Sequence, residues 1–163
     1  MIEIIQGDIL NANEEYICQQ CNCISVRPHG LSASIANKYP HANPYSIRRP
    51  MKGRNMAISS DIATPGSIQV FGSGIQRKVI CMFAQYGMGK PYAYGNTTSD
   101  SSTDRLQWFS ACLERISEMK PGSIAFPYNI GCGLAGGNWT LYSDILYRWS
   151  ENHPEIVIRI YKL

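Results

Sequence analysis

The sequence lacks any long hydrophobic segment. Within its 163 residues, no apolar run approaches the roughly 18 residues that a membrane-spanning helix needs. Its first residues, Met1 to Ile5, contain neither a basic region nor a long apolar stretch, so they do not have the form of a secretory signal. We therefore expect an intracellular protein, cytoplasmic or nuclear, with no membrane partner.

The sequence also lacks a large excess of either charge. It contains 15 lysines and arginines and 12 acidic residues, which gives a net charge of +3. There is no basic stripe with interleaved aromatic residues, the pattern typical of proteins that track single-stranded nucleic acids. The clearest basic cluster comprises Arg48, Arg49, Lys52 and Arg54. Such a cluster is usually a solvated face, and contact with a phosphate-rich ligand or a nucleic acid is the alternative.

The six cysteines do not have the spacing of a metal site. Cys18 and Cys21 form a C-x-x-C pair, but no second pair of cysteine or histidine ligands follows at a distance typical of zinc sites. Most of the cysteines lie in or beside apolar segments, which favours buried, reduced thiols. We therefore predict neither a metal nor another cofactor, and a reducing compartment.

Hydrophobic periodicity predicts strands mixed with helices, the pattern of an α/β sheet covered by helices. The expected strands span residues 3–6, 16–21, 67–71, 78–84, 123–127 and 155–161. The expected helices span residues 31–39, 104–119 and 139–149, with Ser102 or Thr103 and Asn138 or Thr140 as candidate N-caps. We expect one domain over residues 1–163, with a long ordered surface excursion at 40–66 and a loop at 85–103.

The segment after the expected strand at 123–127 is rich in glycine. Four of the seven residues from Gly131 to Gly137 are glycines, and a helix is expected directly afterwards. Glycines allow backbone N–H groups to face an anion, and the following helix N-terminus adds partial positive charge. This pattern predicts a phosphate or diphosphate site, and the alternative is a turn that only packs a helix onto a strand.

A second strand-to-helix loop supports the ligand-binding interpretation. Asn22 ends the strand at 16–21, and Gly30 precedes the next helix. Two such loops can hold the two ends of one nucleotide-like ligand. Asp8 follows the first strand in the same way and is either a turn residue or an acceptor for the amino group of a base.

The motifs at these loops resemble the macro domain family and occur in the same order. The resemblance is strongest to the branch with terminal ADP-ribose protein glycohydrolase, the antitoxin that removes ADP-ribose from DNA bases, and the yeast-type ADP-ribose-1''-phosphate phosphatase. The motifs are Gly7-Asp8-Ile9, Gln20-Cys21-Asn22-Cys23, the run from Gly30 to Pro40 and the run from Ile130 to Trp139. The resemblance implies a three-layer α/β/α fold with a mixed central sheet, and ADP-ribose or an ADP-ribosylated macromolecule as the partner of a monomer.

The resemblance also implies which residues bind the adenine and the diphosphate. Asp8 would bind the adenine amino group, with Ile9 beside it, and Tyr161 would flank the base. The diphosphate would lie on the glycine-rich loop, whose contributing residues would be Gly131, Cys132, Gly133, Leu134, Ala135 and Gly136.

At the other end of the ligand, Asn22 would bind the distal ribose. Gly30 and Leu31 would contact the distal ribose and the diphosphate, and Gln85 would line the same side. Nucleic acid would enter only as a modified substrate.

Two positions depart from the glycohydrolase branch of the family. Ala135 stands where relatives have an acidic residue, and Gln85 follows the strand near which they have a nucleophilic lysine. Lys90 is the nearest lysine, five residues further on. His29 replaces part of the usual Gly-x-Gly pattern in the first loop. Because histidine titrates near neutral pH, His29 is a candidate acid or base, with a loop residue at the pocket rim as the alternative.

Three functions therefore remain open. The first is an ADP-ribosyl hydrolase with an ordered water that the ligand's diphosphate and Asn22 hold, assisted by His29 or Lys90. The second is an ADP-ribose-1''-phosphate phosphatase. The third is a non-catalytic ADP-ribose reader, since the glycine-rich loop serves all three functions equally.

Overall fold

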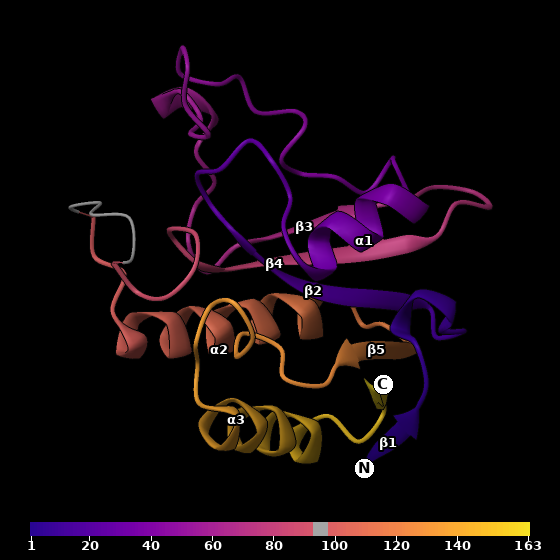
Figure 1. Ribbon diagram of the computed structural model, residues 1–163. Coiled ribbons are helices and arrows are strands. Elements are labelled where there is room, and N and C mark those ends of the chain that lie inside the picture. Colours follow the sequence, from indigo (N-terminus) through magenta and orange to yellow (C-terminus); the bar gives the residue numbers. More distant parts are fainter. Residues whose placement is uncertain (93–97) are drawn as a thin grey trace.

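A computed structural model describes residues 1–92 and 98–163, and Figure 1 shows their arrangement. One six-stranded sheet has the order β1-β6-β5-β2-β4-β3. All neighbouring strands are parallel except β3 and β4, which are antiparallel. The strands are β1 (Ile2–Gln6), β2 (Tyr16–Asn22), β3 (Ile68–Phe71), β4 (Lys78–Gln85), β5 (Ser123–Pro127) and β6 (Val157–Lys162).

Helices cover both faces of this sheet. The α-helices are α1 (Leu31–Lys38), α2 (Ser102–Glu118) and α3 (Trp139–Asn152), and two short 3-10 helices are η1 (Ile9–Asn11) and η2 (Ser59–Asp61). Figure 1 shows α2 and α3 on one side of the sheet and α1 on the other. The three-layer arrangement with a mixed sheet agrees with the predicted fold class.

Each face of the sheet has its own apolar core. Toward α2 and α3, buried residues such as Ile80, Phe109 and Leu146 pack together. Toward α1 and η1, a second core contains Ile17, Ile35 and other buried residues. Because successive side chains of a strand point to opposite faces, the largely apolar strands β2 and β4 supply both cores. This packing fixes where the strands end and where the loops begin.

The predicted elements are confirmed to within a few residues at each end. The loop at Gly72–Gly74 joins two antiparallel strands, as its spacing predicted. The N-cap of α2 is Ser101 instead of Ser102 or Thr103: its hydroxyl accepts from the Asp104 backbone N–H, and the Asp104 side chain accepts from the Ser101 N–H. Asn138 caps α3 as predicted. The part of the expected loop at 93–97 lies outside the described residues.

The excursion at 40–66 packs against the loop that follows β2. The backbone N–H groups of Ala57 and Ala63 donate to the carbonyls of Ile24 and Cys23 over 2.6 and 3.0 Å. The interpretation of the whole basic cluster as a solvated face is wrong for Arg48, whose side chain is 6% exposed and points inward. Lys52 and Arg54 are exposed, as expected.

Five cysteines are buried and Cys132 is partly buried, and all six are free thiols. Within the described residues, no helix combines the length and the apolar character that crossing a membrane requires.

Candidate functional site

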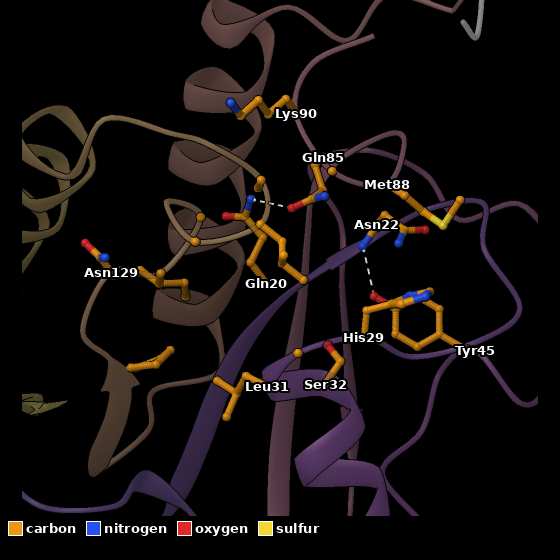
Figure 2. Close-up of a pocket in the computed structure, with 18 of the residues that line it drawn as sticks. Gln20, Asn22, His29, Leu31, Ser32, Tyr45, Gln85, Met88, Lys90 and Asn129 are labelled. Atoms are coloured by element: carbon orange, nitrogen blue, oxygen red, sulfur yellow. Dashed lines mark hydrogen bonds between the residues drawn. The ribbon is translucent and has the colours of Figure 1, made fainter. Parts of the chain in front are cut away.

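A cavity of about 690 Å³ lies at the carboxyl ends of β2, β4 and β5. This is the edge of a parallel α/β sheet at which ligands commonly bind. Its lining comes from five separate stretches of chain, which Figure 2 shows converging around one space. The lining residues lie at positions 20, 22, 29–32, 45, 85, 88–90, 127–131 and 133–135.

The glycine-rich loop forms one wall of the cavity. At Gly131, φ is +75° and an added Cβ would lie 2.7 Å from the Tyr142 ring, so only glycine fits without movement. At Gly133, by contrast, an added Cβ would meet no atom within 4 Å. The loop therefore packs closely against α3 on one side and opens into the cavity on the other.

Three successive backbone N–H groups of this loop lack an internal partner. The N–H groups of Gly136 and Gly137 donate to the carbonyls of Gly133 and Gly131. Those of Gly133, Leu134 and Ala135 donate to no acceptor among the residues that the structure describes. Consecutive unpaired N–H groups in a turn form a concave site for an anion.

The opposite wall is the loop after β2, which is held in place by its own polar groups. The Asn22 side-chain oxygen accepts hydrogen bonds from the backbone N–H groups of Ile24 and Ser25, over 3.1 and 2.8 Å. The Asn22 backbone N–H donates to the Tyr45 hydroxyl over 3.1 Å (Figure 2). Because its oxygen is already engaged, Asn22 offers its amide N–H donors to a ligand.

Arg48 supports this wall from beneath. Its guanidinium donates to the carbonyls of Ser25 and Asn22, over 2.9 Å in each case, and lies against the rings of Tyr45 and Phe83. Burial lowers the pKa of the Arg48 guanidinium, but arginine stays charged at neutral pH because its ordinary pKa is so high. The buried cation therefore orients Asn22 from inside the protein.

Gln85 and Gln20 form a second polar contact at the cavity (Figure 2). The Gln85 side-chain N–H donates to the Gly87 carbonyl over 3.0 Å, and its oxygen accepts from the Gln20 amide over 2.9 Å. Gln85 lines the predicted side of the cavity, but both of its polar atoms are engaged with the protein. It therefore shapes the cavity more than it offers an acceptor to a ligand.

His29 and Lys90 stand at the rim of the cavity and are both exposed. The aliphatic part of Lys90 crosses the glycine-rich loop at Gly136, where an added Cβ would lie 2.8 Å from the Lys90 Cγ. Leu134 is 70% exposed and reaches toward the first loop, since its Cδ1 would lie 3.3 Å from a Cβ at Gly30. The two predicted loops therefore approach each other across the mouth of the cavity.

The structure brings ten of the predicted site residues to this cavity. Six lie outside the glycine-rich loop and four lie within it: Asn22, His29, Gly30, Leu31, Gln85 and Lys90, and Gly131, Gly133, Leu134 and Ala135. All three candidate catalytic residues are therefore on one cavity, although they come from different loops.

Five other predicted residues do not line it. The Asp8 carboxylate caps η1 by accepting from the Leu10 N–H, and Ile9 is buried in the core. The Tyr161 hydroxyl donates to Glu14 over 2.7 Å. Cys132 and Gly136 belong to the glycine-rich loop but are not among the lining residues. Burial raises the pKa of the Cys132 thiol to about 11, so this thiol is neutral at ordinary pH.

Some lining residues were not predicted from the sequence. Gln20, Ser32, Met88 and Gly89 lie close to predicted positions in the sequence, whereas Tyr45 comes from the irregular excursion. The remaining unpredicted stretch is 127–130, in which Asn129 has a left-handed backbone with φ of +68°. Asparagine adopts this conformation more readily than most other non-glycine residues, but the sequence alone does not identify this position.

Comparison with known proteins rests on structure. No family model matches the sequence, and no curated protein matches it significantly. The macrodomain of Mycobacterium tuberculosis DarG superposes with a TM-score of 0.73 at 22% identity, covering 100% of this chain and 98% of that one. The macrodomain of Thermus aquaticus DarG gives 0.69 at 17% identity, covering 100% and 99%.

A third solved structure, Thermosipho africanus DarTG in complex with ADP-ribose, gives a TM-score of 0.64 at 17% identity. The similarity covers 98% of this chain and 41% of that chain. The sheet order, the helices on both faces and these superpositions agree. The chain therefore has the macrodomain fold.

Proposed function

We propose that this protein binds ADP-ribose in the cavity between the glycine-rich loop and the loop after β2. The observation that carries the proposal is that Gly133, Leu134 and Ala135, whose backbone N–H groups have no acceptor among the described residues, line a cavity at the carboxyl edge of the sheet. These groups would donate to the diphosphate oxygens. The amide of Asn22, on the opposite wall, would donate to a ribose hydroxyl.

Charge distribution supports an anionic ligand. Residues 16–99 contain nine lysines and arginines and a single acid, Asp61, whereas the rest of the chain contains six basic and eleven acidic residues. The basic half supplies most of the cavity wall. Lys90 is exposed at its rim. Arg27 and Arg54 are also exposed, and each is next in the sequence to a residue of the Val26–Asn55 hydrogen bond, from which Asn55 reaches the lining residue Met88. Positive potential at a cleft raises the local concentration of anions.

Similar structures provide further support, since one of them was solved as a complex with ADP-ribose. Calorimetric titration of the protein with ADP-ribose tests the proposal directly. We expect saturable binding of one ligand per chain, weaker for ADP and weaker again for adenosine, which lacks the diphosphate. Absence of heat at high micromolar concentrations of protein and ADP-ribose would exclude the proposed function.

Gly133→Glu is the sharpest variant for locating the ligand. A glutamate side chain has room to form because nothing lies within 4 Å of the Cβ position, and it would place a carboxylate where the diphosphate is expected. We expect ADP-ribose binding to fall by at least about a hundredfold, or about 2.7 kcal/mol, with an unchanged thermal midpoint.

Two controls separate the position of the charge from its presence. Gly133→Ala adds a methyl group in the same place without charge, and Gln76→Glu adds the same charge on the distant β3–β4 hairpin. Both are expected to bind within a few-fold of the wild type. Retained affinity in Gly133→Glu would mean that the diphosphate lies elsewhere.

Hydrolysis of ADP-ribosyl groups is the second candidate function, and the convergence of Asn22, His29 and Lys90 on one cavity favours it. Among the described residues that line the cavity there is no aspartate or glutamate, so the lining offers no carboxylate for catalysis. His29 is the lining side chain that carries an imidazole, a group that commonly serves as a general base.

His29→Ala is expected to lower turnover by about a hundredfold, whereas ADP-ribose affinity changes only a few-fold. The assay would offer ADP-ribosylated protein, ADP-ribosylated DNA and ADP-ribose 1''-phosphate to the wild type and to the variant. Consumption of the last substrate alone would favour phosphatase activity. Tight binding without any turnover would establish a reader, and unchanged turnover in the variant would remove His29 from the mechanism.

A further inference from the structure

A buried ion pair lies behind the cavity without reaching it. Arg105 in α2 is 2% exposed and Asp100 is fully buried. The Arg105 Nε and one terminal nitrogen donate to the two Asp100 oxygens, over 2.8 and 2.7 Å. Neither residue lines the cavity, so neither takes part in the contacts proposed above.

The remaining donors of Arg105 connect two walls of the cavity. They reach the carbonyls of Gly87 and Gly89 on one wall, over 3.3 and 2.7 Å, and the carbonyl of Ala135 in the glycine-rich loop, over 3.4 Å. With the two bonds to Asp100, all five N–H donors of the guanidinium have an acceptor. One side chain thereby holds two loops that are more than forty residues apart in the sequence.

Asp100 fixes the same segment from the other side. Its two oxygens also accept the backbone N–H groups of Tyr86 and Gly87, each over 3.0 Å. Four donors therefore surround one buried carboxylate, which is about as many as its lone pairs accommodate. In the segment 86–89, Asp100 therefore binds backbone N–H groups and Arg105 binds backbone carbonyls, so the ion pair holds both kinds of backbone group.

Lys90 directly follows the segment 86–89 in the sequence, and its position depends on this segment and on the glycine-rich loop. The Arg105 bond to the Gly89 carbonyl sets where Lys90 begins, and the Arg105 bond to Ala135 sets Gly136, over which the Lys90 stem passes. Figure 2 shows Lys90 reaching above Gln85 along the cavity. The ammonium therefore stands at the edge of the site through contacts that Arg105 and Asp100 maintain.

We propose that Arg105 and Asp100 are positioning residues that hold the Lys90 ammonium against the diphosphate side of the bound ligand. This proposal rests on ADP-ribose binding in the cavity. Lysine cannot replace Arg105 in this role because its ammonium is a single compact donor group. It cannot span the distances from Asp100 to Gly89 and Ala135 that the planar guanidinium fork spans.

A double-mutant cycle tests whether Arg105 acts through Lys90. ADP-ribose affinity would be measured calorimetrically for the wild type, Lys90→Met, Arg105→Lys and the double variant. Each single variant is expected to weaken binding by about tenfold, the usual effect of losing one charge-assisted contact. The double variant is expected to lose less affinity than the two single losses combined, because part of the Arg105 effect requires the ammonium that Lys90→Met has already removed.

Two control variants test whether a general loss of stability, and not the position of Lys90, weakens ADP-ribose binding. Arg148→Lys changes an exposed arginine in an ion pair with Asp144 on α3, far from the loops, and Ile116→Val makes a small cavity in the core beneath α2. Both are expected to bind as the wild type does. The positioning role is excluded if Arg105→Lys weakens ADP-ribose binding equally in the presence and absence of Lys90. It is also excluded if Ile116→Val, at a similar loss of thermal stability, weakens binding as much as Arg105→Lys does.

A measurement without ligand distinguishes this proposal from the proposed function. In the wild type and in Arg148→Lys, we expect a nuclear Overhauser effect between the Lys90 side-chain methylene protons and the Gly136 α-protons. We expect this signal to be lost in Arg105→Lys. Persistence of this signal in Arg105→Lys would overturn the positioning role even if ADP-ribose binds. Failure of the wild type to bind ADP-ribose would instead exclude the function while this signal still reports on the contact.

Discussion

The two loops that form the cavity are each held by a buried arginine, and the two arginines are compensated in different ways. Arg105, beside the glycine-rich loop, faces the carboxylate of Asp100 over 2.7 Å. Arg48, beneath the loop after β2, forms no ion pair among the described residues and instead contacts two carbonyls and two aromatic rings. The arginine that holds the glycine-rich loop is thus neutralised by a carboxylate, whereas the arginine that holds the loop after β2 is stabilised by carbonyl dipoles and aromatic rings.

The difference follows from where acidic residues occur in the chain. No acid occurs between residues 16 and 60, and the nearest one that follows, Asp61, pairs with Arg49 instead of Arg48. A buried charge without a counterion is unfavourable unless its donors are satisfied. Arg48 satisfies this condition through the carbonyls of Asn22 and Ser25, and it leaves the neighbouring wall with a net positive charge that suits an anionic ligand.

Asp100→Asn is expected to have the largest effect on stability. The asparagine amide would present N–H donors to the donors of Arg105 and Gly87, and the Arg105 charge would remain buried without its counterion. We expect the free energy of unfolding to fall by about 3–5 kcal/mol, measured by urea denaturation. A loss below about 1 kcal/mol would mean that water or another group compensates Arg105.

Arg48→Met is expected to have an intermediate effect. Methionine fills much of the volume of the arginine stem but leaves the Asn22 and Ser25 carbonyls without donors. The free energy of unfolding should fall by about 1–3 kcal/mol, less than in Asp100→Asn because no buried charge remains behind. Faster amide hydrogen exchange at Ser25 would accompany it. An effect as large as that of Asp100→Asn would contradict the contrast between the two arginines.

Arg49→Met is expected to have the smallest effect, since Arg49 pairs with Asp61 at the surface. Hydrogen bonds from Arg49 hold the pKa of the Asp61 carboxyl at about 2, below its usual value near 3.8. A lowered carboxyl pKa stabilises the fold above pH 4, and this contribution is lost as the pH falls toward 2.

In Arg49→Met, the Asp61 pKa should therefore rise toward its usual value, which carbon NMR titration of the carboxyl would detect. The thermal midpoint at neutral pH should stay unchanged, because exposed ion pairs contribute little. A large fall in that midpoint would show that the surface pair matters as much as the buried ones.

The secondary structure was predictable because it depends on local patterns. Alternation of apolar residues identified the strands, and the glycines at 131–137 together with the following helix identified one binding loop. The cap of α2 was misplaced by one residue or two because Ser101, Ser102 and Thr103 are all good N-caps. Choosing between them requires the backbone geometry, since only Ser101 and Asp104 form the reciprocal pair.

The outlying site residues were harder to predict because they depend on contacts between distant segments. Tyr45 reaches the cavity only because the excursion at 40–66 folds back over the loop after β2. Arg48 looked like a member of an exposed cluster, and only its neighbours in space show that it is buried. Asp8 and Tyr161 stand at the strand ends that a ligand would be expected to use, yet they bond to Leu10 and Glu14.

The sequence by itself determined the α/β architecture, the two strand-to-helix loops and the shortage of acidic residues around them. These features depend on hydrophobic periodicity, glycine spacing and charge, which are local properties of the sequence. The tertiary structure decided which polar atoms remain available to a ligand. An N–H group or an amide is free or engaged according to what lies within 3 Å of it, and the partners of Asn22, Gln85 and the buried arginines come from distant parts of the chain.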